Sequence, residues 1–202
     1  MSTVRTQNLK NACRALERST DRTSTWRPVF HLAPVTGWLN DPNGLCQIGD
    51  THHIFFQYSP FDVKPGLNYW GHYTTEDFVH YQYCEPALCS DEVRLSRRIF
   101  RFCTGAGRHH VPVLYRKRAP AGQRGLRLYH CRQRTQHHSA ESEDGLHFTK
   151  KTVLLYNEDY PADLTCHVRD PKVWKDGDSF AMVLGARRKD DVGEVLVYRS
   201  DD

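Results

Sequence analysis

The stretch WLNDPNGLCQIGDTHHIFFQYS, residues 38–59, decides the expected fold. Its second half, HHIFFQYS at 52–59, has the apolar and aromatic content of a buried β-strand. Its first half holds Asp-Pro-Asn-Gly at 41–44, residue types that favour turns. A tight turn at Asp41 would present its carboxylate at a surface. Taken alone, this pattern is more typical of an Asx-type turn between strands than of a reactive site.

Further short strands are expected along the chain, and their regular spacing predicts an all-β fold, either a sandwich or a propeller. They are LNYWGHYTT (67–75), FVHYQYC (78–84), a strand entered from a turn in EDGLHF (143–148), a hairpin in DPKVWKDGDSFAMVLGAR (170–187), and EVLVYRS (194–200). The exception is VRTQNLKNACRALER (4–18), whose apolar residues recur at near-helical spacing. We expect a short amphipathic helix there, followed by a polar linker through Thr25.

Composition excludes several classes of protein. The 202 residues suffice for one well-buried domain, and a mean hydropathy of −0.68 argues against a membrane protein. The first 25 residues lack the apolar centre of a signal peptide. Seven cysteines without a CxxC pair suit free thiols in a reducing compartment. These features predict a cytoplasmic protein.

A second Asp-Pro pair occurs in RDPKVW, residues 169–174. Arg169 beside Asp170 favours the ionised form of that carboxyl group. Near the first pair, Trp38 offers an apolar face of the kind that stacks on sugar rings. Two Asp-Pro pairs with tryptophan close by suggest two carboxylates in one pocket, as glycoside hydrolysis requires.

Five segments taken in order, RPVFHLAPVTGWLNDPNGL, HIFFQYSPF, NYWGHYTTEDFVHY, ESEDGLHFTKKTVLL and HVRDPKVWK, resemble glycoside hydrolase family 32. Within the family, the resemblance is to bacterial intracellular invertases and sucrose-6-phosphate hydrolases. The resemblance covers about residues 26–93 and 141–202. It implies the N-terminal part of a five-bladed β-propeller over 26–202, preceded by the helix and linker of 1–25. The β-sandwich that follows the propeller in this family is absent from these residues.

The resemblance implies hydrolysis of terminal β-D-fructofuranosides with retention, in carbohydrate metabolism. Asp41 would be the nucleophile that forms a covalent fructosyl-enzyme. Asp170 would stabilise the transition state through hydrogen bonds to fructose hydroxyls, with Arg169 beside it. An oxocarbenium-like transition state agrees with this role, because it needs a carboxylate close to the anomeric carbon.

The same resemblance implies the substrate contacts. Asn40 and Gln57 would hold sugar hydroxyls, and Trp38 and Trp70 would line the pocket. The expected partner is a small sugar, namely sucrose, sucrose 6-phosphate or a fructo-oligosaccharide. We expect no cofactor, no metal ion, no nucleic acid and no membrane partner.

The general acid/base of the family is the Glu of a Glu-Cys dipeptide downstream of the RDP motif. No Glu-Cys occurs in these 202 residues. The pair Cys84-Glu85 has the reverse order and lies far upstream. We therefore expect this chain to be a fragment without hydrolytic activity.

The segment between Arg94 and Ala140 departs from the family pattern, with eleven Arg, one Lys and no acidic residue. The family's aromatic-Ser-Gly-Ser-Ala motif is missing there. Arg98 to Gly105 can be encoded by CGT ATA TTC CGG TTC TGC ACT GGT, which read one base later gives Val-Tyr-Ser-Gly-Ser-Ala-Leu. VPVLYRKR (111–118) likewise yields Tyr-Leu-Phe-Tyr-Thr-Gly-Asn-Val. Our hypothesis is that 94–140 is out of frame.

Other interpretations remain open for this segment and for the chain. An Arg-rich insertion in a variable loop ranks second, and a nucleic-acid or zinc site ranks third. The candidate zinc ligands match no established finger spacing; they are Cys103, His109, His110, Cys131, His137 and His138. For the whole chain, the alternatives are a non-catalytic product of a disrupted gene and a related five-bladed arabinan or xylan hydrolase.

Overall fold

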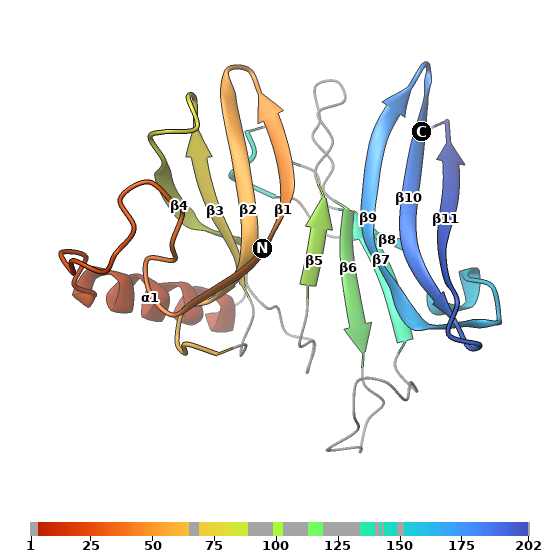
Figure 1. Ribbon diagram of the computed structural model, residues 1–202, viewed down its shortest axis with the longest axis horizontal. Coiled ribbons are helices and arrows are strands. Elements are labelled where there is room, and N and C mark those ends of the chain that lie inside the picture. The colour runs from red at the N-terminus through yellow and green to blue at the C-terminus, as the bar shows by residue number, and fades with distance from the viewer. Residues whose placement is uncertain are drawn as a thin grey trace. The chain divides into compact units, whose positions relative to one another are not determined.

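The computed structural model describes most of the chain (Figure 1). The described residues are 4–64, 69–88, 99–102, 113–118, 134–139, 142, 144–148 and 152–201. They divide into two compact units, Met1–Arg97 and Arg98–Asp202, and each unit is described by itself.

The first unit contains one helix and one four-stranded antiparallel sheet, in the order β1-β2-β3-β4. Its elements are α1 (Val4–Ser19), β1 (Trp38–Ile48), β2 (Thr51–Ser59), β3 (Tyr69–Thr75) and β4 (Gln82–Leu88). Strands that follow one another in both sequence and space form a meander, the sheet type of a propeller blade. The expected N-terminal helix and the strand-rich fold are thereby confirmed.

The two faces of this sheet have different neighbours. Phe56, Tyr58 and Tyr73 form a buried cluster with Cys13 of α1, so the helix covers this face. Side chains alternate along a strand, which directs Gln57, between Phe56 and Tyr58, to the opposite face. Gln57 and the Asp41 carboxylate that it contacts therefore lie on the face that the helix does not cover.

Polar contacts fix α1 against the sheet. The buried Glu17 carboxylate accepts hydrogen bonds from the hydroxyls of Tyr58, at 3.1 Å, and Tyr83. Burial, together with this carboxylate, raises the pKa of both tyrosines. Near the surface, Arg14 donates two hydrogen bonds to Glu85, at 2.6 and 2.8 Å. The buried Glu17 carboxylate thus has hydrogen-bond donors, and these contacts fix the position of α1 on the sheet.

The second unit contains two sheets. Four strands form one antiparallel meander, namely β5 (Ile99–Phe102), β6 (Val113–Arg118), β7 (Arg134–Ser139) and β8 (Thr152–Leu155). A 3-10 turn, η1 (Asn157–Asp159), precedes the second sheet of β9 (Leu164–Asp176), β10 (Ser179–Arg188) and β11 (Gly193–Ser200). Leu164, Val168 and Leu184 form its core with Tyr160. The hairpin expected within 170–187 is confirmed.

A turn with a distinct hydrogen-bond pattern separates β3 from β4. Asp77 Oδ1 accepts the backbone N–H groups of Val79, at 2.9 Å, and His80, at 2.7 Å. Asp77 Oδ2 lies 2.6 Å from His80 Nδ1, and Thr75 Oγ1 accepts the Phe78 N–H. The His80 side chain and these backbone donors hold the pKa of Asp77 well below its usual range.

The same turn recurs between β7 and β8. Asp144 Oδ1 accepts the N–H groups of Leu146 and His147, both at 2.8 Å, and Ser142 Oγ accepts that of Gly145. Burial alone would raise the pKa of Asp144, but its hydrogen bonds to His147 and the backbone lower it. Each turn begins with a Ser or Thr followed by two acidic residues, and Ser200-Asp201-Asp202 at the end of β11 repeats this sequence pattern. The two four-stranded sheets are therefore built on one repeating plan.

Two local predictions are corrected by the structure. The strand expected at 78–84 begins only at Gln82, because the Asp77 turn occupies 76–80. Cys46 and Cys84 are free thiols as expected, whereas Cys166 is disulfide-bonded. The turn expected in EDGLHF is confirmed at 144–147, and the strand after it begins at Thr152.

Strands β5, β6 and β7 lie within the arginine-rich segment, and its other positions lie outside the described residues. The proposed change of reading frame concerns the gene and stays a prediction. Within the described part of the chain, no helix combines the length and the apolar character needed to cross a bilayer.

Candidate active site

Asp41 lies inside strand β1, and the tight turn expected at 41–44 is not formed. Asn40 pairs with Gln57 and Pro42 pairs with Phe56, which leaves Asp41 as the extra residue of a β-bulge. Its φ is +36°, in the left-handed region. Residue types that favour turns also favour β-bulges. In a bulge, one extra residue does not pair with the neighbouring strand, and the strand continues beyond it. The carboxylate is exposed, as expected.

Asp170 lies in a bulge of the same kind in strand β9. Arg169 pairs with Gly185 and Lys172 pairs with Val183, so two residues of β9 face one residue of β10. The φ of Asp170 is +59°. A left-handed conformation costs a non-glycine residue about 1–3 kcal/mol and is found preferentially at functional sites. Both Asp-Pro motifs therefore place a strained aspartate on a bulge.

Three of the predicted site residues meet at the Asp41 bulge. Gln57 Nε2 donates a hydrogen bond to Asp41 Oδ2 over 3.1 Å. Asn40 Nδ2 lies 3.4 Å from Gln57 Oε1 and donates to it. Gln57 is only 3% exposed, so it holds the carboxylate from the sheet side. Among the described residues, the second carboxylate oxygen, Oδ1, accepts no hydrogen bond, and the side chain is open to solvent.

Asn43 is a site residue that sequence reasoning missed. Its Nδ2 donates a hydrogen bond to the Asp41 backbone carbonyl over 2.7 Å. Its Oδ1 accepts a hydrogen bond from Trp70 Nε1, also at 2.7 Å. The signal was present in the sequence, because Asn side chains commonly bond to backbone groups two residues away.

Trp70 lies beneath the motif and is 1% exposed. Its ring stacks on Phe55 with centroids 3.9 Å apart. A Cβ atom at Gly44, whose φ is +62°, would lie 2.5 Å from the indole, so only glycine fits there. Trp38 opens β1 and is half-buried. The sugar contacts of both tryptophans stay predictions.

An aromatic stack continues behind Trp70. His72 stacks on Phe55 at 4.1 Å, and His53 Nδ1 lies 3.0 Å from His72 Nε2. Burial, and then the nearby His53, lowers the pKa of His72 to about 3. His72 is therefore uncharged at neutral pH and contributes to an apolar floor below the motif.

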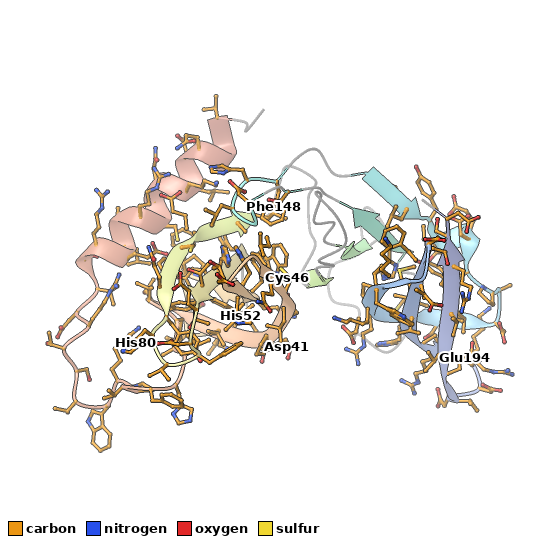
Figure 2. All side chains as sticks on the ribbon, turned by 90° about the horizontal axis from the view of Figure 1, so that it is seen from above. Asp41, Cys46, His52, His80, Phe148 and Glu194 are labelled. Carbon is orange, nitrogen blue, oxygen red and sulfur yellow. The ribbon has the colours of Figure 1, made fainter. Side chains whose placement is uncertain are left out.

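In the second unit, Arg169 Nε lies 3.5 Å from Asp170 Oδ2, and both side chains are partly exposed. The arginine thus stands beside the aspartate as the sequence suggested. Asp41, labelled in Figure 2, and Asp170 belong to different units, and each cluster is described within its own unit.

The residues considered for zinc binding form no site in the described part of the chain. No group of three or more His, Cys, Asp or Glu side chains there is arranged to hold a metal ion. His137 is buried, and its Nδ1 lies 2.5 Å from the Tyr160 hydroxyl. Cys103, His109, His110 and Cys131 lie outside the described residues.

Comparison with protein families gives one match over most of the chain. The sequence model described as Glycosyl hydrolases family 32 N-terminal domain matches residues 31–202. The chain is 36% identical over 198 residues to a raffinose invertase of Escherichia coli, covering 96% of this chain and 39% of that protein. It is 34% identical to a sucrose-6-phosphate hydrolase of Escherichia coli, covering 88% of this chain and 36% of that protein. The chain therefore spans about two fifths of the length of these curated relatives.

Solved structures show a similar fold at lower identity. A variant of the Bombyx mori GH32 beta-fructofuranosidase in complex with sucrose matches with a TM-score of 0.80 and 23% identity, over 100% of this chain and 40% of that one. A sucrose-6-phosphate hydrolase from Lactobacillus gasseri matches with a TM-score of 0.76 and 23% identity, over 97% and 38% of the two chains.

Proposed function

The chain belongs to glycoside hydrolase family 32, and we propose that it forms the nucleophile-bearing part of a retaining β-fructofuranosidase. The proposed substrates are sucrose and sucrose 6-phosphate, the class to which the names of the curated relatives point. The observation that supports this function best is the Asp41 bulge. It presents an exposed carboxylate beside the amide side chains of Asn40 and Gln57.

In the proposed reaction, Asp41 Oδ1 attacks the anomeric carbon of the fructosyl unit while Gln57 holds Oδ2. The bond from that carbon to the leaving sugar breaks as the bond to Asp41 forms, which gives a covalent fructosyl-enzyme. The leaving oxygen takes its proton from a second carboxyl group, and water then releases fructose with the reverse proton transfer. Retaining enzymes hold the two carboxyl groups about 5–5.5 Å apart.

Asp170 is the proposed stabiliser of the transition state. As positive charge develops on the fructosyl ring, its carboxylate would accept hydrogen bonds from the sugar hydroxyls. Arg169, 3.5 Å away, favours the ionised form that this role needs. Asn40 and Gln57 would hold sugar hydroxyls beside Asp41, and Trp38 would stack on the ring.

We further propose that the sheets are blades of a five-bladed propeller. Two complete four-stranded meanders support this arrangement, because both carry the same Asp-His turn between their third and fourth strands. The last strand of the third sheet ends at Ser200, and in sequence Ser200-Asp201-Asp202 repeats the residue types that open this turn. A turn repeated at the same place in successive sheets is typical of architectures built from one unit.

These 202 residues alone should not hydrolyse sucrose. They contain no Glu-Cys dipeptide, and the acid/base step therefore has no assigned group. The proposed out-of-frame segment, 94–140, would add a second defect. Sequencing the gene across these codons tests the frame, because an intact frame in several independent clones would contradict the proposal.

The function is tested in a chimera that restores the missing groups. Residues 31–88 of this chain would replace the matching segment of the Escherichia coli raffinose invertase. We expect the chimera to release reducing sugar from raffinose or sucrose, and Asp41→Asn to abolish that release. Asp50→Asn, at an exposed position of the β1–β2 turn, serves as the control. A folded chimera without activity, or with activity that survives Asp41→Asn, would contradict the proposed function.

A further inference from the structure

We propose that Asn43 and Trp70 are positioning residues, which set the direction of the Asp41 carboxylate from within the core. The proposal rests on the proposed function for the identity of Asp41 as the nucleophile. Both residues are buried, with 5% and 1% exposure, and the role proposed for them acts through Asp41.

The first step concerns the backbone of Asp41. As the extra residue of a bulge, Asp41 has no partner in the β1–β2 register, and its φ of +36° is unfavourable for a side-chain-bearing residue. The hydrogen bond from Asn43 Nδ2 to the Asp41 carbonyl, at 2.7 Å, fixes the peptide that follows the strained residue. It thereby stabilises a conformation that the ladder itself does not support.

The second step concerns Asn43. Its amide could rotate and bond elsewhere unless its oxygen were also held. Trp70 Nε1 donates to that oxygen over 2.7 Å and so fixes which end of the amide faces Asp41. The connection joins β3 to β1 across 27 positions of sequence.

The third step concerns Trp70, which has little freedom to move. Phe55 stacks on one part of its ring at 3.9 Å with an interplanar angle of 16°. On another side, the missing side chain of Gly44 leaves just enough room, since a Cβ there would lie 2.5 Å from the indole. The packed core thus fixes the indole, the indole fixes Asn43, and Asn43 fixes Asp41.

The consequence for catalysis follows from the exposure of the carboxylate. Its described side-chain partner is Gln57, so packing around the carboxylate cannot direct it. Beyond the hydrogen bond from Gln57, its direction is set by the Asp41 backbone. A displacement of about 1 Å at a reacting group can cost on the order of a hundredfold in rate, and a rigid chain of contacts prevents such a displacement.

The test uses NMR spectroscopy of the 202-residue chain. In the unaltered chain, we expect the Trp70 indole proton to exchange with solvent at least roughly tenfold more slowly than that of Trp26. Trp26 is 93% exposed and supplies an internal reference. An indole proton of Trp70 that exchanges as fast as that of Trp26 would overturn the proposal without any substitution.

Substitutions then separate positioning from packing. Trp70→Phe removes the donor and keeps an aromatic ring, and Asn43→Ala removes both bonds of the amide. We expect each to shift the carboxyl carbon resonance of Asp41, and the double variant to shift it no further than one single variant. Tyr73→Leu, which loosens the buried cluster on the α1 face of the sheet and keeps both hydrogen bonds, should lower the melting temperature and leave that resonance in place.

An Asp41 resonance that stays unchanged in Trp70→Phe and Asn43→Ala would overturn the proposal. So would an equal shift in Tyr73→Leu, because the effect would then come from a general loss of packing and not from the contacts of Trp70 and Asn43. Sugar release by the chimera tests the function and these resonances test the positioning, so failure of one is distinguishable from failure of the other.

Discussion

Asp41 and Asp170 occupy equivalent positions in two different sheets. Each precedes a proline, each is an extra residue where its strand bulges away from its neighbour, and each has a positive φ, +36° and +59°. Glycine is the residue that adopts such angles without strain. Aspartate tolerates such angles better than most other residues with a side chain, and at both bulges it leaves a carboxylate exposed.

Gly44, which follows the Asp41 bulge, and Gly49 allow the cost of backbone strain to be separated from the cost of a steric clash. Gly44→Ala and Gly49→Ala both place a methyl group at a positive φ, +62° and +59°. Only at Gly44 does the new Cβ meet the Trp70 indole, whereas nothing lies within 4 Å at Gly49. We expect Gly49→Ala to lower the free energy of unfolding by about 1 kcal/mol and Gly44→Ala by about 2–4 kcal/mol. Urea unfolding of the two variants checks this, and equal losses would contradict the predicted clash.

The contact between Gln57 and Asp41 predicts a pH-dependent variant. Gln57→Glu would place a second carboxyl group about 3 Å from Asp41, at a buried position, and like charges raise the pKa of one carboxyl of such a pair. A raised folded-state pKa stabilises the fold at low pH, and that stability is lost as the pH rises through it. We therefore expect Gln57→Glu to unfold more easily at pH 7 than at pH 4.

Urea unfolding at the two pH values measures this effect. Gln47→Glu is the matched control, because Gln47 is exposed in β1, the strand of Asp41, and bonds to the Gly49 carbonyl. A loss of stability at pH 7 that is the same in both variants would show that Gln57 and Asp41 do not face one another.

The tyrosines against Glu17 predict loss of stability in alkaline solution. Burial, supported by Glu17, raises the pKa of Tyr58 and Tyr83 above that of an unfolded tyrosine, about 10. A group whose folded-state pKa is raised contributes stability that is lost as the pH rises past its unfolded value. We expect the free energy of unfolding to fall above about pH 10, and to fall less steeply in Tyr83→Phe.

Tyrosinate absorbance and urea unfolding, followed over the same pH range, measure this effect. Tyr156→Phe, at an exposed tyrosine, serves as the control and should leave the slope unchanged. A wild-type chain whose stability is constant above pH 10 would contradict the buried contact between α1 and the sheet.

The repeated Asp-His turns predict a loss of stability in acidic solution, in contrast to the alkaline loss predicted for the tyrosines. Hydrogen bonds from His80 and the backbone lower the pKa of Asp77, and those to His147 and the backbone outweigh burial in lowering that of Asp144. Stability from such groups is present above the unfolded pKa of about 3.9 and is lost as the pH falls through the folded value. We expect the double variant Asp77→Asn, Asp144→Asn to have a lower melting temperature at neutral pH.

Between pH 4 and pH 2, the melting temperature of the double variant should fall by less than that of the wild type. Calorimetry at these pH values provides the measurement, with the exposed Asp62→Asn as control. Parallel losses in wild type and double variant would show that the turn carboxylates do not titrate with folding.

Several features of the fold followed from local sequence patterns. The spacing of apolar residues in 4–18 predicted α1, and the aromatic run of 52–59 predicted β2. The turn residues Asp176-Gly177-Asp178 predicted the β9–β10 hairpin, which the pairing confirms. These patterns succeed because helix and strand periodicity, and the backbone freedom of turn residues, act between near neighbours.

The two Asp-Pro motifs mark the limit of that reasoning. Their residue types fit a tight turn and a bulge equally, so the choice depends on the partner strand. For Asp41 that partner is β2, whose register leaves one residue of β1 unpaired. The expectation of a turn was wrong for this reason, although the exposed carboxylate was correct.

By itself, the sequence determined the strands, the helix, the family and the aspartates on which a fructosidase would depend. Only the tertiary structure decided that Asp41 stands on a strained bulge and that Asn43 joins it to Trp70. The physical reason is that a strand's own pattern sets which face a side chain takes, whereas its partner across the sheet depends on register. Register is fixed by two strands and their burial together, and no single stretch of sequence contains it.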